Sequence, residues 1–308
     1  MADLQEIRNT LKSFKPESKD STLKQYASQL RKLFGILGGT TKLNQPKFVL
    51  DKISDLKYLT RRNYMNSLIL YLQATDSASQ KVLKTYTDER NKLNEEYNKQ
   101  QSTGKISEKQ APNFVSLAEL QKMTKRMLDD YKKTGNIKTL MNYTMFEILM
   151  KHPFRNDLAG MIYIGKREYN TLKKQGKLLE KNYLVQEANN MFFVLRDYKT
   201  VKKYGEKKID VEKSVKSKLR KYIREGKIEK GDVLFDIPKE SYSHNLIEAS
   251  LKYSNKRIGT TMIRHIYLSD KHGEAKKQMD KDAYTMGHSV NTATGVYVKD
   301  PADFKTIE

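Results

Sequence analysis

Near its C-terminal end the chain contains the stretch GHSVNTATGVYVK, which sets His288 and Tyr297 nine positions apart. Many basic side chains accompany this tyrosine over residues 155–297. Transfer of a phosphoryl group needs cations around the equatorial oxygens, an acid for the leaving oxygen and a nucleophile in line with it. The residue types therefore indicate phosphoryl transfer without a metal ion, with a tyrosine as the candidate nucleophile.

The composition indicates a polyanionic partner. Lys and Arg number 59 against 37 Asp and Glu in 308 residues, giving a formal charge of +22. Nucleic acid is the expected partner of such an excess. A membrane surface is also anionic, but the sequence has neither an apolar run of about eighteen residues nor a secretory leader pattern. We therefore expect an intracellular protein, in the cytoplasm or nucleus of a host cell, that binds nucleic acid and no membrane.

Residue types and spacing exclude several kinds of active site. The sequence has no cysteine, which removes disulfides, thiolate metal sites and cysteine nucleophiles. The five histidines are scattered, and no H-E-x-x-H, G-x-S-x-G or glycine-rich phosphate loop is present. We therefore expect no metal, no cofactor and no small-molecule substrate.

The elements that must position these groups begin with amphipathic helices. Residues 21–37 place their apolar side chains on one helical face, with Ser21 as the expected N-cap and Gly38 as the stop. Residues 59–75 and 79–100 predict two more helices with the same kind of pattern. Together they predict a small helical domain.

A polar stretch separates this region from the rest of the chain. Residues 99–113 contain Gly and Pro and show no apolar period, which predicts a linker. We therefore expect one domain over residues 1–106 and a second over 107–308. Ser116 and Glu119 have the spacing of a capping box, in which each side chain satisfies a free backbone donor, and predict the start of a helix.

The second domain is predicted to combine helices with a small sheet. Residues 140–150 indicate a buried helix that ends before Pro153. Residues 190–200 and 207–215 indicate two strands, joined by a turn in which Gly205 supplies a positive φ. Helical patterns follow. The predicted fold class is mainly α with a small β-sheet.

Four short motifs of this domain stand out: HPFRND (152–157), LRDYKT (195–200), TTMIRHIYLSD (260–270) and MGHSVNTATGVYV (286–298). The last two resemble the H-x-x-R-H and L-G-H-S…T…Y boxes of the tyrosine recombinases, or phage-type integrases. The first two are similar to that family's first arginine box and β-hairpin lysine site. The resemblance covers most of the chain. It implies an N-terminal helical core-binding (SAM-like) domain, a linker and a mixed α/β catalytic domain.

The resemblance also implies a role for each matched residue. Arg155 and Arg264 would clamp the scissile phosphate, because planar guanidinium groups suit its oxygens bidentately. Lys199 would protonate the departing 5′ oxygen. His288 would donate to a non-bridging oxygen or help to take the tyrosine proton. Tyr297 would attack phosphorus and hold the strand as a 3′-phosphotyrosyl bond.

On this interpretation the protein is a site-specific DNA recombinase or integrase. The resemblance implies double-stranded DNA as the partner, a homotetramer on paired DNA sites, and no requirement for metal or nucleotide. The lysine-rich, cysteine-free composition is similar to that of integrases of large DNA viruses and their satellites, which indicates a viral or mobile-element origin.

The sequence departs from the family pattern at two positions. Thr261 stands three before Arg264, where the family usually has His or Lys; its hydroxyl can donate to a phosphate oxygen but is no strong base. His265 is adjacent to Arg264 and on a helix would point elsewhere, so it is not expected to replace that base. Asp157 follows Arg155 by two positions rather than the usual three, and whether it orients the arginine depends on geometry.

Two other functions remain open at this stage. A type IB DNA topoisomerase uses nearly the same groups to relax supercoils as a single protein, but the separate N-terminal domain and short linker favour a recombinase. A catalytically degenerate relative would bind DNA without cutting it, and Thr261 is the feature that supports it.

Overall fold

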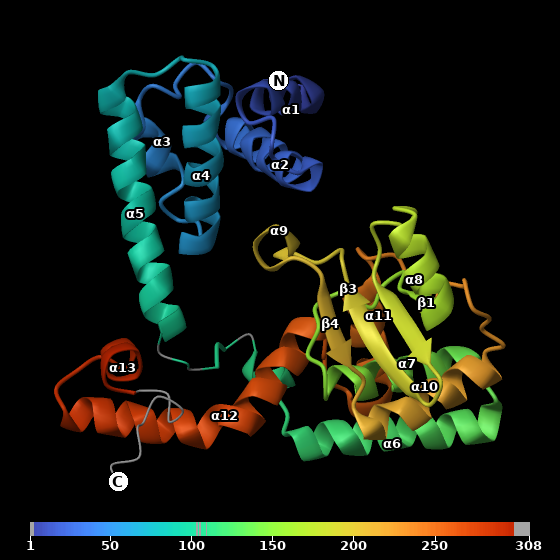
Figure 1. Cartoon of the computed structure of the whole chain (residues 1–308). Helices are drawn as coiled ribbons and strands as arrows, with labels where there is room; N and C mark the ends of the chain where they lie inside the picture. The colour runs from blue at the N-terminus through green and yellow to red at the C-terminus, as the bar shows by residue number, and fades with distance from the viewer. Residues whose placement is uncertain (1–2, 103, 105, 109, 299–308) are drawn as a thin grey trace, which may run out of the picture. The chain divides into compact units, whose positions relative to one another are not determined.

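The computed structural model describes residues 3–102, 104, 106–108 and 110–298 (Figure 1). Contacts within the chain divide it into two compact units, Met1–Ile106 and Ser107–Glu308. Each unit has a hydrophobic core of its own. Among the described residues, no helix is both long enough and apolar enough to cross a membrane.

Within residues 3–102 the first unit consists of helices: α1 (Leu4–Phe14), α2 (Asp20–Leu37), α3 (Pro46–Lys52), α4 (Tyr58–Ala74) and α5 (Gln80–Ser102). The predicted apolar face of α2 is buried, and Gly38 ends the helix with a φ of 71°. The prediction of Ser21 as N-cap was wrong, because Lys19 occupies that position and Asp20 is already helical. An acidic residue in the first turn suits the positive end of the helix dipole.

The first and third helices were not predicted. Helix α1 buries only Ile7 and Leu11, and the seven-residue α3 buries only Val49. Such short elements contain too few apolar positions to establish a helical period. Their packing against neighbouring helices, rather than their own pattern, stabilises them.

Tyr86 of α5 is a central side chain of this unit. It is fully buried, and its hydroxyl donates to the carbonyl of Leu43 at 2.7 Å. Burial raises the pKa of Tyr86. Tyr97, further along α5, has the guanidinium of Arg62 over its ring at 4.6 Å. Both tyrosines therefore serve helix packing.

Within residues 110–298 the second unit contains a 3-10 turn (Ala111–Asn113), α6 (Leu117–Thr134), α7 (Ile137–Leu149), β1 (Ile162–Gly165), α8 (Lys166–Lys174), β2 (Tyr183–Glu187), β3 (Asn190–Leu195), α9 (Val201–Tyr204), β4 (Lys207–Asp210), α10 (Lys213–Glu225), α11 (Tyr242–Ser254), α12 (Thr260–Thr285), α13 (Val290–Thr292) and a π-helical turn (Ala293–Tyr297). The capping box of Ser116 and Glu119 is present in full at the start of α6. The structure is mainly helical with a small mixed sheet.

The sheet has the order β1-β2-β3-β4, with β1 parallel to β2 and the other pairs antiparallel (Figure 1). One face packs into the main core, which includes Phe193 and Leu195, and the other packs against Tyr169 of α8. Strands β1 and β2 were not predicted, because strands buried on both faces lack the polar alternation that marks a half-exposed strand. Strands β3 and β4 end at Leu195 and Asp210, before the predicted limits.

We expect Tyr86→Phe to lower the free energy of unfolding of the N-terminal unit by about 1 to 3 kcal/mol, because the buried Leu43 carbonyl loses its donor. Urea unfolding of the full chain, followed by circular dichroism, measures this change. Tyr26→Phe, at a half-buried position of α2, is the control. Equal stability of both variants would show that the buried hydroxyl contributes nothing.

Candidate active site

The structure brings Arg155 and Arg264 close together; these two residues are called the arginine pair below. Arg155 is exposed in the loop that follows α7, and the half-buried Arg264 lies in the second turn of α12. Burial lowers the pKa of Arg264, and the neighbouring charge of Arg155 lowers it further, whereas Asp157 opposes the shift. Two like charges held near each other form a site that a bound anion would stabilise.

Asp157 contacts the backbone of the first arginine segment. Its side chain is 7% exposed, and Oδ2 accepts a hydrogen bond from the backbone N–H of Arg155 at 3.1 Å. Burial raises the pKa of Asp157, while this hydrogen bond and the charges of Lys239 and Arg155 oppose the increase. Asp157 therefore shapes the loop around Arg155 through the main chain.

Asn156 joins this loop to the start of α12. Its Oδ1 accepts from the Thr260 hydroxyl at 3.1 Å, and its Nδ2 donates to the carbonyl of Lys239 at 3.0 Å. Because Thr260 is the first residue of α12, this contact sets the helix that carries Arg264 against the loop that carries Arg155.

A second asparagine, Asn182, joins the Arg155 loop to the segment after β3. Its side chain is 4% exposed, and its Nδ2 donates to the carbonyls of Asp157 at 2.8 Å and Asp197 at 2.9 Å. Its Oδ1 accepts from the backbone N–H groups of Arg196 at 2.8 Å and Asp197 at 2.9 Å. Sequence reasoning missed both asparagines, since a lone Asn beside a short apolar run gives no signal of its partners.

Lys199 lies outside the predicted strand, because β3 ends four residues earlier at Leu195. It is exposed in residues 196–206, called the lysine connection below, which joins β3 to β4 and includes α9. The strand ends there because the chain folds into a helical turn, which Gly205 closes with a φ of 66°. The positive φ predicted for Gly205 is confirmed.

The other lysines near Lys199 differ in their surroundings. Lys207 lies over the ring of Tyr198 at 5.0 Å, and Lys208 lies over Phe192 at 4.2 Å. Lys203 lies over the ring of Tyr204 at 5.1 Å. Within the described residues, the Lys199 ammonium makes no ion pair or hydrogen bond. The aromatic contacts partly occupy its neighbours, whereas Lys199 is available to a ligand.

His288 and Tyr297 contact each other at the other end of the unit. Their rings stack with centroids 5.2 Å apart and an interplanar angle of 24°. Tyr297 is 55% exposed, at the end of the π-helical turn. The Ser289 side chain caps α13 by accepting from the backbone N–H of Thr292 at 3.1 Å.

The structure does not bring this pair to the arginine pair. Residues 267–298, called the C-terminal arm below, begin within α12, and none of residues 267–282 is buried. Figure 1 shows α12 extending from the sheet and its helices, with α13 near its far end. At a rise of 1.5 Å per residue, the helix separates Arg264 from Thr285 by about 30 Å. Thr261 and His265 are both exposed near the start of α12.

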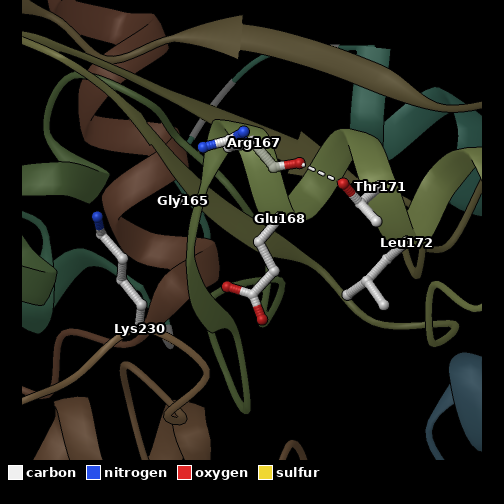
Figure 2. A pocket seen from close by; sticks show the side chains of 6 residues that line it. All are labelled: Gly165, Arg167, Glu168, Thr171, Leu172 and Lys230. Atoms are coloured by element: carbon white, nitrogen blue, oxygen red, sulfur yellow. Dashed lines mark hydrogen bonds between the residues drawn. The ribbon is translucent and has the colours of Figure 1, made fainter.

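A pocket at the junction of β1 and α8 contains none of the predicted site residues. Gly165, Arg167, Glu168, Thr171, Leu172 and Lys230 line it (Figure 2). The Thr171 hydroxyl is used within α8, where it donates to the Arg167 carbonyl at 3.0 Å. Among the described residues, no group of three or more His, Cys, Asp or Glu side chains could hold a metal ion.

Comparison with known proteins adds little. No protein-family model matches the chain, and no curated protein matches it. The solved structures similar to it include the "Crystal structure of XerA recombinase", with a TM-score of 0.33 and 11% sequence identity over 97% of this chain and 95% of that chain. At so low a TM-score and identity, the similarity carries no argument about function.

The buried carboxyl of Asp157 generates a pH-dependent prediction. Because its folded pKa lies above its ordinary value of 3.8, the folded chain holds this proton to higher pH than the unfolded chain does. Asp157 therefore costs stability as the pH rises from 3.8 through its raised pKa. Across that interval the free energy of unfolding of Asp157→Asn should rise relative to the wild type, then stay level.

Urea unfolding at a series of pH values measures this difference. Asp210→Asn, which removes an exposed carboxylate of the same unit, controls for loss of a negative charge. A difference between Asp157→Asn and the wild type that falls as the pH rises would mean that the nearby cations outweigh burial.

Proposed function

We propose that the protein is a site-specific DNA recombinase or integrase that cleaves and rejoins strands through a 3′-phosphotyrosyl intermediate. The observation that carries the proposal is the arginine pair, whose members come from distant segments and meet beside a buried carboxylate. Two guanidinium groups at one point suit the non-bridging oxygens of a phosphodiester. The charge of +22 supplies the attraction to DNA.

In the cleavage step, the Tyr297 hydroxyl oxygen forms a bond to phosphorus while the bond from phosphorus to the 5′ oxygen breaks. His288, whose ring stacks on the ring of Tyr297, takes the tyrosine proton once its ring turns to present a nitrogen to the hydroxyl. Lys199 gives a proton to the departing 5′ oxygen, and the arginine pair stabilises the charge on the non-bridging oxygens. Attack by a 5′ hydroxyl reverses the step and reseals the strand without an external energy source.

The position of the C-terminal arm bears on how the site is completed. Tyr297 reaches an arginine pair either when α12 breaks within the arm, where Gly273 weakens the helix, or when a second copy supplies its arm. Both routes make activity conditional on assembly at DNA. The second route requires another protomer, and it favours a recombinase that acts on paired sites over a topoisomerase that acts as a single protein.

A second candidate is a DNA-binding protein that no longer cuts. The distance between Tyr297 and the arginine pair favours it, as does Thr261 in place of a basic side chain. Covalent capture of DNA separates the two candidates.

We expect Tyr297→Phe to abolish covalent capture of a nicked suicide DNA substrate that carries the terminal repeats of the virus or mobile element that encodes the protein. DNA binding should stay intact, because only the nucleophilic oxygen is removed. Denaturing electrophoresis detects the covalent band. Tyr284→Phe is the matched control, since Tyr284 lies on the same arm and is 87% exposed. A covalent band that persists in Tyr297→Phe would place the nucleophile elsewhere.

We expect Lys199→Ala to slow cleavage of ordinary DNA on the order of 100-fold or more, as is typical for loss of a general acid. A substrate with a 5′-bridging sulfur should restore the rate, because a thiolate leaves without a proton. Lys202→Ala, from the same lysine connection, is the control and should behave like the wild type on both substrates. Rescue of Lys202→Ala instead would assign the acid to that lysine.

A further inference from the structure

Every hydrogen-bonding group of the Asn182 side chain has a partner within the protein. Its amide makes two donor and two acceptor hydrogen bonds, at 2.8 to 2.9 Å, and the residue is 4% exposed. A carboxamide has two N–H donors and one oxygen that can accept two hydrogen bonds, so none of its capacity is left over here. Replacing it would leave several backbone groups of the two segments unpaired.

The partners of Asn182 belong to the two segments that carry the proposed chemistry. On one side is the carbonyl of Asp157, in the loop that holds Arg155. On the other side are the backbone groups of Arg196 and Asp197, at the start of the lysine connection. One side chain therefore sets the position of the lysine connection relative to the arginine pair.

Further hydrogen bonds within the lysine connection hold the backbone of Lys199 in a defined position relative to Arg196 and Asp197. The backbone N–H of Val201 donates to the carbonyl of Tyr198 at 3.2 Å, and that of Gly205 donates to the carbonyl of Val201 at 2.8 Å. The buried Tyr198 hydroxyl donates to the Gly205 carbonyl at 2.7 Å. Lys199 therefore lies between Asp197, which is bound to Asn182, and the hydrogen-bonded turn that ends at Gly205.

Asp197 makes a second contact, an ion pair with Lys239 at 2.8 Å in which both side chains are partly exposed. The carbonyl of the same lysine accepts from Asn156. The two asparagines are therefore linked through this ion pair, and the start of the lysine connection is anchored from two directions.

We propose that Asn182 is a positioning residue that places the Lys199 ammonium at the leaving 5′ oxygen of a phosphate bound by the arginine pair. This inference rests on the function proposed above. Asn182 touches neither DNA nor the reacting atoms. Its loss affects protonation of the leaving group and leaves attack by Tyr297 unchanged.

The test compares strand-cleavage rates on ordinary DNA and on DNA with a 5′-bridging sulfur. For Asn182→Ala we expect the rate on ordinary DNA to fall about 10- to 100-fold, the scale of a misplacement of about 1 Å. The sulfur substrate should be cleaved at close to the wild-type rate. A general loss of folding would slow both substrates equally, so the ratio of the two rates isolates the positioning role.

Asn142→Ala is the matched control. Asn142 is another buried asparagine of this unit, 8% exposed, and its Oδ1 accepts from Asn245 at 2.8 Å. We expect it to leave the ratio of the two rates at the wild-type value. If Asn182→Ala fails to fold by circular dichroism, Tyr198→Phe, which loosens the other end of the lysine connection, takes its place with the same expected pattern.

Each outcome decides the proposal. A selective loss on ordinary DNA supports it. An equal loss on both substrates, or no loss on either, overturns the positioning role while the proposed function stands. If the wild-type protein forms no covalent adduct with either substrate, the proposed function fails and this inference fails with it.

Discussion

The candidate site depends on the hydrogen bonds of two asparagine carboxamides, the half-buried Asn156 and the buried Asn182. Three segments that are distant in the sequence meet there: the loop of Arg155, the lysine connection and the start of α12. Asn156 and Asn182 satisfy polar groups on all three. Buried polar groups without partners are costly, so the segments are stable in this arrangement and less stable in others. The contact of Asn156 with Thr260 holds two like-charged arginines close together before any phosphate is bound, and Asn182 sets the lysine connection beside them.

The two halves of the proposed chemistry are organised differently. Arg155 and Lys199 lie on loops beside a sheet that is buried on both faces, and Arg264 lies at the start of α12, whose Ile263 and Ile266 belong to the same core. Such a setting suits preorganised stabilisation of charge. The proposed nucleophile, Tyr297, lies on the C-terminal arm, where Ala283 and Ala293 are the buried residues among positions 267–298. Such an arm can change its position at little cost in buried apolar area. A tyrosine hydroxyl is a weak nucleophile without activation, so on the proposed mechanism DNA stays uncut while Tyr297 is apart from the arginine pair.

Sequence reasoning predicted the elements that a local residue pattern marks, and it missed the elements that depend on contacts between distant residues. The apolar period of α2 and the capping box at Ser116 were readable, and both are confirmed. The four-residue strand β1 and the ties made by Asn182 were not readable, because their partners lie far along the chain. Motif spacing suggested that Tyr297 belongs with Arg264, but spacing along a chain does not show that α12 runs unbroken to Thr285 and carries the following residues away from Arg264.

The central claim is that Tyr297 and the arginine pair are apart in the free chain and come together on DNA. The sequence has no cysteine, so His265→Cys and Thr294→Cys allow spin labels at two exposed positions beside the two halves of the site. Pulsed electron resonance on this pair, in a Tyr297→Phe background that leaves DNA uncut, should give a single long distance without DNA, on the order of 20 to 30 Å, because most of the length of α12 separates the two labels. Binding of DNA with paired sites should add a much shorter distance, within one chain or between two. A short distance already present in the free protein, or none after DNA binding, would contradict the account.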